Sequence, residues 1–211
     1  MEIKHLKSED IMGMEKIFRS NLINSLSGYK SANLIGTEHE GYSNLAIFNS
    51  VVHIGANPPL LGMIQRPHTV ERQTLENIRS TGCYTINHLP EQLVENAHYT
   101  SAKFERQESE FEHCKIDKQY LDKFPAPFVK DSPVKLGMRL REEVPIESNG
   151  TILIVGEIEL AEIDESLITE DGQLDLNRAH TVAISGLNRY HLPKEIAAFP
   201  YARKEELPDF K

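Results

Sequence analysis

The sequence predicts a mainly β protein, a small closed or nearly closed barrel with peripheral helices. Three observations carry this prediction. Short segments rich in apolar and β-compatible residues recur along the chain, turns containing Gly, Pro and Asn separate them, and helical periodicity is confined to a few stretches. With 211 residues, 39% of them hydrophobic, the chain is long enough to bury one core.

The first predicted element is a helix between residues 8 and 27. Its apolar residues recur at steps of three and four, and Gly28 follows as a stop signal. The residues that carry this amphipathic pattern are Ile11, Met14, Phe18, Leu22 and Leu26. Residues 1–28 therefore form a predicted N-terminal helical extension.

Short strands and two helices follow this extension. The strands are predicted at residues 31–38, 42–49, 60–65 and 83–89. One helix, at residues 70–80, is ended by Gly82. The other, at residues 90–102, opens with Pro90 in the favoured first position. Residues 103–133 are polar and interrupted by Pro, so we expect an excursion with little regular structure that covers part of the fold. The acidic residues at 105–112 are expected to form a solvated face of this excursion.

Two longer strands are predicted at residues 134–147 and 151–164. The Asn149-Gly150 step between them suits the positive φ angles of a tight hairpin. A turn with a short helical segment and a last strand complete the pattern, at residues 167–180 and 181–190. We expect a single domain at residues 29–203 and a charged tail at residues 204–211.

Composition excludes several classes of function. The net charge is −9, which disfavours binding to nucleic acid or to an anionic membrane. No apolar stretch is long enough to cross a bilayer and the N-terminus lacks a signal-peptide core, so we expect a cytoplasmic protein. Cys83 and Cys114 have no ligand-spaced partner and the nine histidines do not pair at helical spacing, so no metal site is predicted.

Loops typical of common catalytic sites are absent from the sequence. There is no GxGxxG after a strand, no GxxxxGK[ST], no GxSxG and no HExxH. The sequence therefore gives no motif for a dinucleotide fold, a P-loop, an esterase or a zinc protease.

Asn49 and Ser50 interrupt an apolar run where a buried strand would carry valine or isoleucine. The pair is compatible with a β-bulge or with donors and acceptors turned toward a bound ring system. Farther along, Arg66 ends a strand and Thr74 lies at the beginning of a helix. A helix N-terminus beside a guanidinium can receive a phosphate, although Thr74 can equally cap its helix and Arg66 can be a surface residue.

Taken in order, the motifs resemble the flavin reductase-like family, FMN-binding split β-barrel proteins related to flavoredoxin and to the reductase component of nitrilotriacetate monooxygenase. The resemblance begins with "SNLAIFNSVVHIGANPPLLGMIQRP", "RQTLENIRSTGCYTINHL" and "AHYTSAKFERQESEFEHC". It continues through "SPVKLGMRLREEVPI", "TILIVGEIELAEID" and "LNRYHLPKEIAAFPYAR", and covers roughly residues 30 to 203.

The resemblance implies a Greek-key-like split barrel that forms a homodimer, with FMN in a groove near the dimer interface. The strand residues implied at the isoalloxazine edge are Asn44, Leu45, Ala46, Ile47, Phe48, Asn49 and Ser50. Arg66 and Thr74 are implied at the ribityl phosphate, and Tyr190 matches a family aromatic near the flavin. Ile47 and Asn49 depart from the proline and serine that the family often has, so hydrogen bonding to the ring is expected to differ.

Three functions follow from the resemblance and the residues. The first is an NAD(P)H-dependent flavin reductase that passes hydride to N5 of FMN, with an oxygenase or another protein as electron acceptor. No residue of the chain is assigned a catalytic role, because the flavin does the redox chemistry itself. The second is a non-enzymatic FMN-binding electron carrier, and the third is a barrel that has lost flavin and acts as an interaction module.

Overall fold

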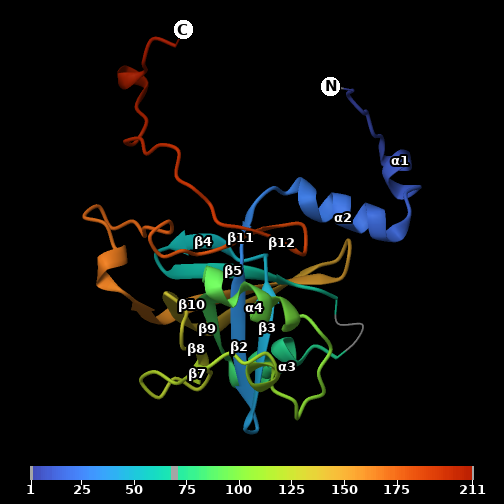
Figure 1. Cartoon of the computed structure of the whole chain (residues 1–211), viewed down its shortest axis with the longest axis vertical. Helices are drawn as coiled ribbons and strands as arrows, with labels where there is room; N and C mark the ends of the chain where they lie inside the picture. Colours follow the sequence, from blue (N-terminus) through green and yellow to red (C-terminus); the bar gives the residue numbers. More distant parts are fainter. Residues whose placement is uncertain (1, 68–70, 211) are drawn as a thin grey trace.

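The computed structural model describes residues 2–67 and 71–210 (Figure 1). Its main feature is a seven-stranded antiparallel sheet in the order β3-β2-β6-β9-β10-β5-β4. The strands are β2 Asn33–His39, β3 Tyr42–Phe48, β4 Val52–Ala56, β5 Pro59–Gln65, β6 Cys83–His88, β9 Val134–Ile146 and β10 Thr151–Ile163. The predicted mainly β class is confirmed, and β4 is a strand that the sequence pattern did not separate.

The sheet must curl, because its two edges are joined by a very short link. Only residues 49–51 connect β3 at one edge to β4 at the other. No ladder closes the gap between β3 and β4 in the described residues, so the barrel is split along this line. Apolar side chains fill its interior, and the largest fully buried ones include Tyr84, Met63 and Met138.

The long hairpin β9–β10 forms as predicted, with a difference in its turn. Gly150 has a φ of 71°, whereas Asn149 is not among the residues with positive φ. Instead, Asn149 Oδ1 accepts hydrogen bonds from the backbone N–H and the hydroxyl of Thr151 at 3.0 and 2.7 Å. The asparagine therefore closes the turn through its side chain.

Helix α3 (Gln73–Thr81) packs on the barrel and ends at Gly82, whose φ of 69° is the left-handed conformation of a C-terminal cap. The second predicted helix divides into a 3-10 turn, Glu91–Leu93, and α4 (Val94–Tyr99). The predicted last strand is a hairpin of β11 (Ala183–Ser185) and β12 (Arg189–His191), and β11 pairs with β1 (Lys30–Ser31). A 3-10 turn at Glu165–Leu167 precedes it.

The excursion at residues 103–133 covers the sheet, as expected. It holds α5 (Glu110–His113) and the small ladder of β7 (Lys118–Gln119) with β8 (Phe128–Val129). Its buried apolar residues are Phe111, Cys114, Ile116, Phe124, Ala126, Phe128 and Val129. The segment is therefore a second layer of the core.

The N-terminal extension is two helices instead of the one predicted. α1 (Ser8–Met12) ends at Gly13, and α2 (Lys16–Leu26) begins after Glu15, whose carboxylate accepts from the N–H groups of Ile17 and Phe18 at 2.8 and 2.9 Å. Neither helix has a buried residue. The extension and the C-terminal segment, with its 3-10 turn Lys204–Glu206, project from the end of the molecule that carries β4, β11 and β12 (Figure 1). Within the described residues, no helix has the length and apolar character needed to cross a membrane.

Candidate functional site

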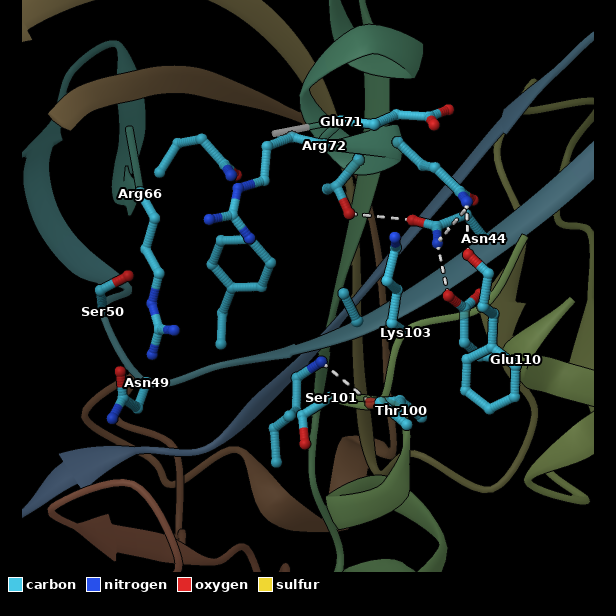
Figure 2. A pocket seen from close by; sticks show the side chains of 18 of the residues that line it. Asn44, Asn49, Ser50, Arg66, Glu71, Arg72, Thr100, Ser101, Lys103 and Glu110 are labelled. Atoms are coloured by element: carbon cyan, nitrogen blue, oxygen red, sulfur yellow. Dashed lines mark hydrogen bonds between the residues drawn. The ribbon is translucent and has the colours of Figure 1, made fainter. Parts of the chain in front are cut away.

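A cavity of about 530 Å³ opens beside the split in the barrel. Its wall is formed by the second half of β3 with the following turn, the end of β5, the start of α3, residues 100–105 and Glu110. Figure 2 shows Arg66, Asn49 and Ser50 on one side of this space and Asn44 and Glu110 on the other, with Arg72 and Lys103 reaching in between. The cavity is thus lined by polar and charged side chains over an apolar strand.

Eight of the ten residues that the resemblance implies at the site line this one cavity. They are Asn44, Ala46, Ile47, Phe48, Asn49, Ser50, Arg66 and Thr74. Leu45 does not line it, because its side chain is buried in the core. Tyr190 does not line it either. Its ring lies on β12, packs against the core cluster that includes Leu34 and Leu45, and its hydroxyl is 2.9 Å from Nδ1 of His98. A flavin contact by Tyr190 therefore stays a prediction.

β3 presents an unpaired edge to the cavity. Because β3 is the last strand of the sheet, alternate N–H groups point away from β2 and need other acceptors. The N–H of Leu45 donates to Glu110 Oε2 at 2.9 Å and that of Ile47 to the Thr100 hydroxyl at 3.0 Å. The next N–H in this alternation belongs to Asn49 and has no acceptor among the described residues. It is a backbone donor available to a ligand.

The polar pair at the end of β3 has two different roles. The Ser50 hydroxyl donates to the C=O of Ile64 and accepts from its N–H, both at 3.1 Å, so it ties the turn between β3 and β4 to β5. The Asn49 side chain donates through Nδ2 to the C=O of Gly186 at 2.9 Å. The hydrogen of Ser50 is therefore used within the protein, whereas the Oδ1 of Asn49 accepts from no described residue.

Positive charge gathers where β5 ends and α3 begins. Arg66 follows β5, Arg72 immediately precedes α3, and Lys103 belongs to the segment 100–105 that lines the same cavity. No carboxylate among the described residues forms an ion pair with these three side chains. The first backbone bond of α3 runs from Glu76 N to Arg72 O at 3.0 Å, so the N–H groups of the preceding helical residues face the helix end. This arrangement suits a phosphate.

Glu110 is the largest departure from the sequence analysis. The acidic run at 105–112 was expected to be a solvated face, but Glu110 is only 4% exposed. Its carboxylate accepts from Asn44 Nδ2 at 2.8 Å and from the Leu45 N–H, because β3 offers donors that nothing else in the fold satisfies. Burial raises the pKa of Glu110, and these hydrogen bonds oppose the shift.

The sequence analysis also missed Gln65, Arg72, Thr100 and Lys103. Arg72 had a usable signal, since it opens the "RQT" segment that places Thr74 at the helix start. Gln65 and Arg72 are informative for another reason. Gln65 Oε1 and Arg72 Nε are buried without a hydrogen-bond partner among the described residues, and both residues line the cavity. Unpaired buried polar atoms fit a site whose polar ligand completes the hydrogen bonding.

The fold and this cavity define a split-barrel protein with a pocket lined by polar and charged side chains. The family model for the flavin reductase like domain matches residues 30–180, and the chain belongs to this family. A crystal structure of a candidate flavin reductase with a split barrel domain, from Shewanella frigidimarina NCIMB 400, is 48% identical with a TM-score of 0.91, covering 94% of this chain and 100% of that one.

Two more distant structures share the fold. Nitrilotriacetate monooxygenase component B from Bacillus cereus is 18% identical with a TM-score of 0.81, covering 94% of this chain and 100% of its own. Flavoredoxin of Desulfovibrio vulgaris (Miyazaki F) is 21% identical with a TM-score of 0.72, covering 83% of this chain and 92% of its own. The resemblance inferred from the sequence is confirmed, and so is the split-barrel fold.

Proposed function

We propose that the protein binds FMN in the cavity beside β3 and acts as an NAD(P)H-dependent flavin reductase. The observation that carries the proposal is one cavity that is lined both by an unused backbone donor, the Asn49 N–H, and by a helix N-terminus flanked by Arg66 and Arg72. FMN has a ring with hydrogen-bond acceptors at one end and a phosphate at the other. The cavity offers groups that match both parts of FMN.

The ring would lie along β3. Ala46 and Phe48 supply apolar surface, and the N–H of Asn49 donates to a ring acceptor. Asn49 Oδ1 is an acceptor for a ring N–H, since its Nδ2 is already bonded to Gly186. Ser50 contributes indirectly, because its hydroxyl fixes the turn that carries the Asn49 backbone.

The phosphate would lie at the start of α3. Guanidinium groups form charge-assisted, often bidentate hydrogen bonds to phosphate, and Arg66 and Arg72 can supply them from two sides. The backbone at Thr74 belongs to the first turn of α3, where the helix dipole favours negative charge. Removing the phosphate from the ligand should therefore cost affinity.

Bound FMN would supply the redox chemistry, accepting hydride at N5 from NAD(P)H. The chain supplies binding and orientation. Anaerobic titration with NADH and NADPH, followed by visible absorption, tests the proposal: oxidised flavin bands should appear in the protein loaded with FMN and bleach on mixing. Protein that stays colourless after incubation with FMN and desalting contradicts flavin binding. Bound flavin that does not bleach within the turnover time indicates an electron carrier instead.

We further propose that the protein is a cytoplasmic homodimer and hands reducing equivalents to an oxygenase or another acceptor protein. Support for dimerisation comes from large apolar residues on α2 and the C-terminal segment, of which Phe18, Leu26 and Phe199 are 59%, 67% and 86% exposed. Support for an oxygenase partner is the shared fold with a monooxygenase component.

A further inference from the structure

We propose that the hydroxyl oxygen of Thr74 accepts a hydrogen bond from a ligand hydroxyl in the cavity. Glu110 is the positioning residue: it orients the Asn44 amide, and this amide in turn orients the Thr74 hydroxyl. The inference rests on the proposed function, because FMN has hydroxyls on its ribityl chain. It assigns the Thr74 side chain to that chain and leaves the phosphate to the arginines and to the backbone of α3.

The orientation of the Asn44 amide is the first step. The Leu45 N–H can only donate, so Glu110 Oε2 accepts from it at 2.9 Å. The other carboxylate oxygen lies 2.8 Å from the side-chain nitrogen of Asn44. An ionised carboxylate has acceptors only, so it holds the amide with Nδ2 toward Glu110 and Oδ1 turned away.

Two neighbours at longer distances match this orientation. Gln73 donates through Nε2 to the C=O of Phe104 at 3.0 Å, which leaves Gln73 Oε1 as an acceptor 3.5 Å from Asn44 Nδ2. The other neighbour is Thr37, whose hydroxyl accepts from Asn77 Nδ2 at 3.1 Å and therefore directs its own hydrogen toward Asn44 Oδ1 at 3.4 Å. The amide is thus surrounded by acceptors on its nitrogen side and by a donor on its oxygen side.

The direction of the Thr74 hydrogen bond follows from this orientation of the Asn44 amide. Its hydroxyl lies 2.9 Å from Asn44 Oδ1, which can only accept, so the hydrogen of Thr74 is spent on that bond. Only lone pairs of the Thr74 oxygen remain for a ligand in the cavity that Thr74 lines. A phosphate oxygen has no hydrogen to offer at neutral pH, whereas a sugar-alcohol hydroxyl does. The site therefore selects a hydroxyl at this position.

Three flavins distinguish a contact to the ribityl hydroxyls from a contact to the phosphate. They are FMN, riboflavin, which lacks the phosphate, and lumiflavin, which lacks the hydroxylated chain. Fluorescence quenching measures their dissociation constants. Thr74→Val should weaken FMN and riboflavin by a similar factor, about three- to tenfold, and leave lumiflavin unchanged. Thr74→Ser, which keeps the hydroxyl, is the matched control. Weaker FMN with unchanged riboflavin would place the hydroxyl at the phosphate and overturn the inference, as would no effect on FMN and riboflavin or an equal loss for all three.

Glu110→Gln tests the positioning step. The glutamine must offer its oxygen to the Leu45 N–H and its nitrogen to Asn44, so the Asn44 amide turns and frees the Thr74 hydrogen for the ligand. Glu110→Gln should then raise the ratio of FMN affinity to riboflavin affinity. This rise should be at least threefold larger in the protein that keeps Thr74 than in the Thr74→Val protein. Equal rises in both backgrounds would indicate a simple charge effect and overturn the role of Glu110. Wild-type protein that binds none of the three flavins would instead overturn the proposed function itself.

Discussion

The hydroxyl of Ser50 and the backbone of Ile64 are joined by two hydrogen bonds, each 3.1 Å long, between the β3–β4 turn and β5. The β4–β5 ladder extends only as far as the pair Val52 and Gly62. Ser50 therefore supplies with one side chain the donor and the acceptor that a longer β4 would have supplied from its backbone. The bridge holds the turn that carries Asn49 at a fixed distance from β5.

Replacing Ser50 with Ala should lower the free energy of unfolding by about 1–3 kcal/mol, because both backbone groups of Ile64 lose a partner in a partly buried place. Urea denaturation measures the change. Ser101→Ala is the matched control, since Ser101 also lines the cavity but is exposed and donates only to a nearby carbonyl. Equal stabilities of the two variants would show that the bridge contributes nothing.

Removing the Arg66 guanidinium should weaken FMN about tenfold or more and leave riboflavin within about twofold, because a charge-assisted hydrogen bond to phosphate is lost. Isothermal titration with both ligands measures the difference. Arg79→Ala changes the net charge by the same amount, but Arg79 pairs with Glu143 away from the cavity, so it controls for long-range electrostatics. A parallel loss of riboflavin affinity in Arg66→Ala would remove Arg66 from the phosphate end.

Local patterns predicted much of the fold and one side of the site. Short segments rich in apolar and β-compatible residues indicated the strands, and Gly82 marked the end of α3. Asn49, Arg66 and Thr74 were found because each lies next to an element boundary that the sequence marks, where side chains and free backbone groups meet a ligand. The family resemblance then connected these separate positions into one site.

The other side of the site could not be read from the sequence. Glu110 lies within an acidic run that has the composition of a solvated surface, and it is buried only because it meets the N–H of Leu45, a residue 65 positions earlier. The break between α1 and α2 is similar. Helical periodicity continues through Gly13, and the capping carboxylate of Glu15 decides that a new helix begins there.

His88 should make the protein less stable in acid. Burial lowers the pKa of His88 from 6.5 to about 4, so between these values the unfolded chain binds more protons than the folded protein. Stability from this group is complete above pH 6.5 and falls as the pH decreases, by about 3 kcal/mol at pH 4. The free energy of unfolding, measured in urea from pH 7 to pH 4, should fall by about 3 kcal/mol less in His88→Gln than in the wild type. Identical pH dependence of both proteins would contradict the assignment.

The exposed apolar residues of α2 should hold two copies of the chain together. Ile17, Phe18 and Leu26 are 68%, 59% and 67% exposed, and α2 buries no residue against its own barrel. Exposed apolar surface on this scale marks an interface, and the commonest partner of such a surface is a second copy related by a twofold axis. Light scattering after size-exclusion chromatography should give a dimer for the wild type.

The Ile17→Ser, Phe18→Ser double variant should shift this equilibrium toward monomer, with dissociation increasing on dilution. Asn21→Ser, on the same helix, is the matched control, since it changes an exposed polar residue and should leave the dimer intact. The circular dichroism of the double variant should match that of the wild type, because neither residue packs in the core. A wild type that is monomeric at all concentrations, or a double variant as dimeric as the control, would assign the exposed apolar residues of α2 to another partner.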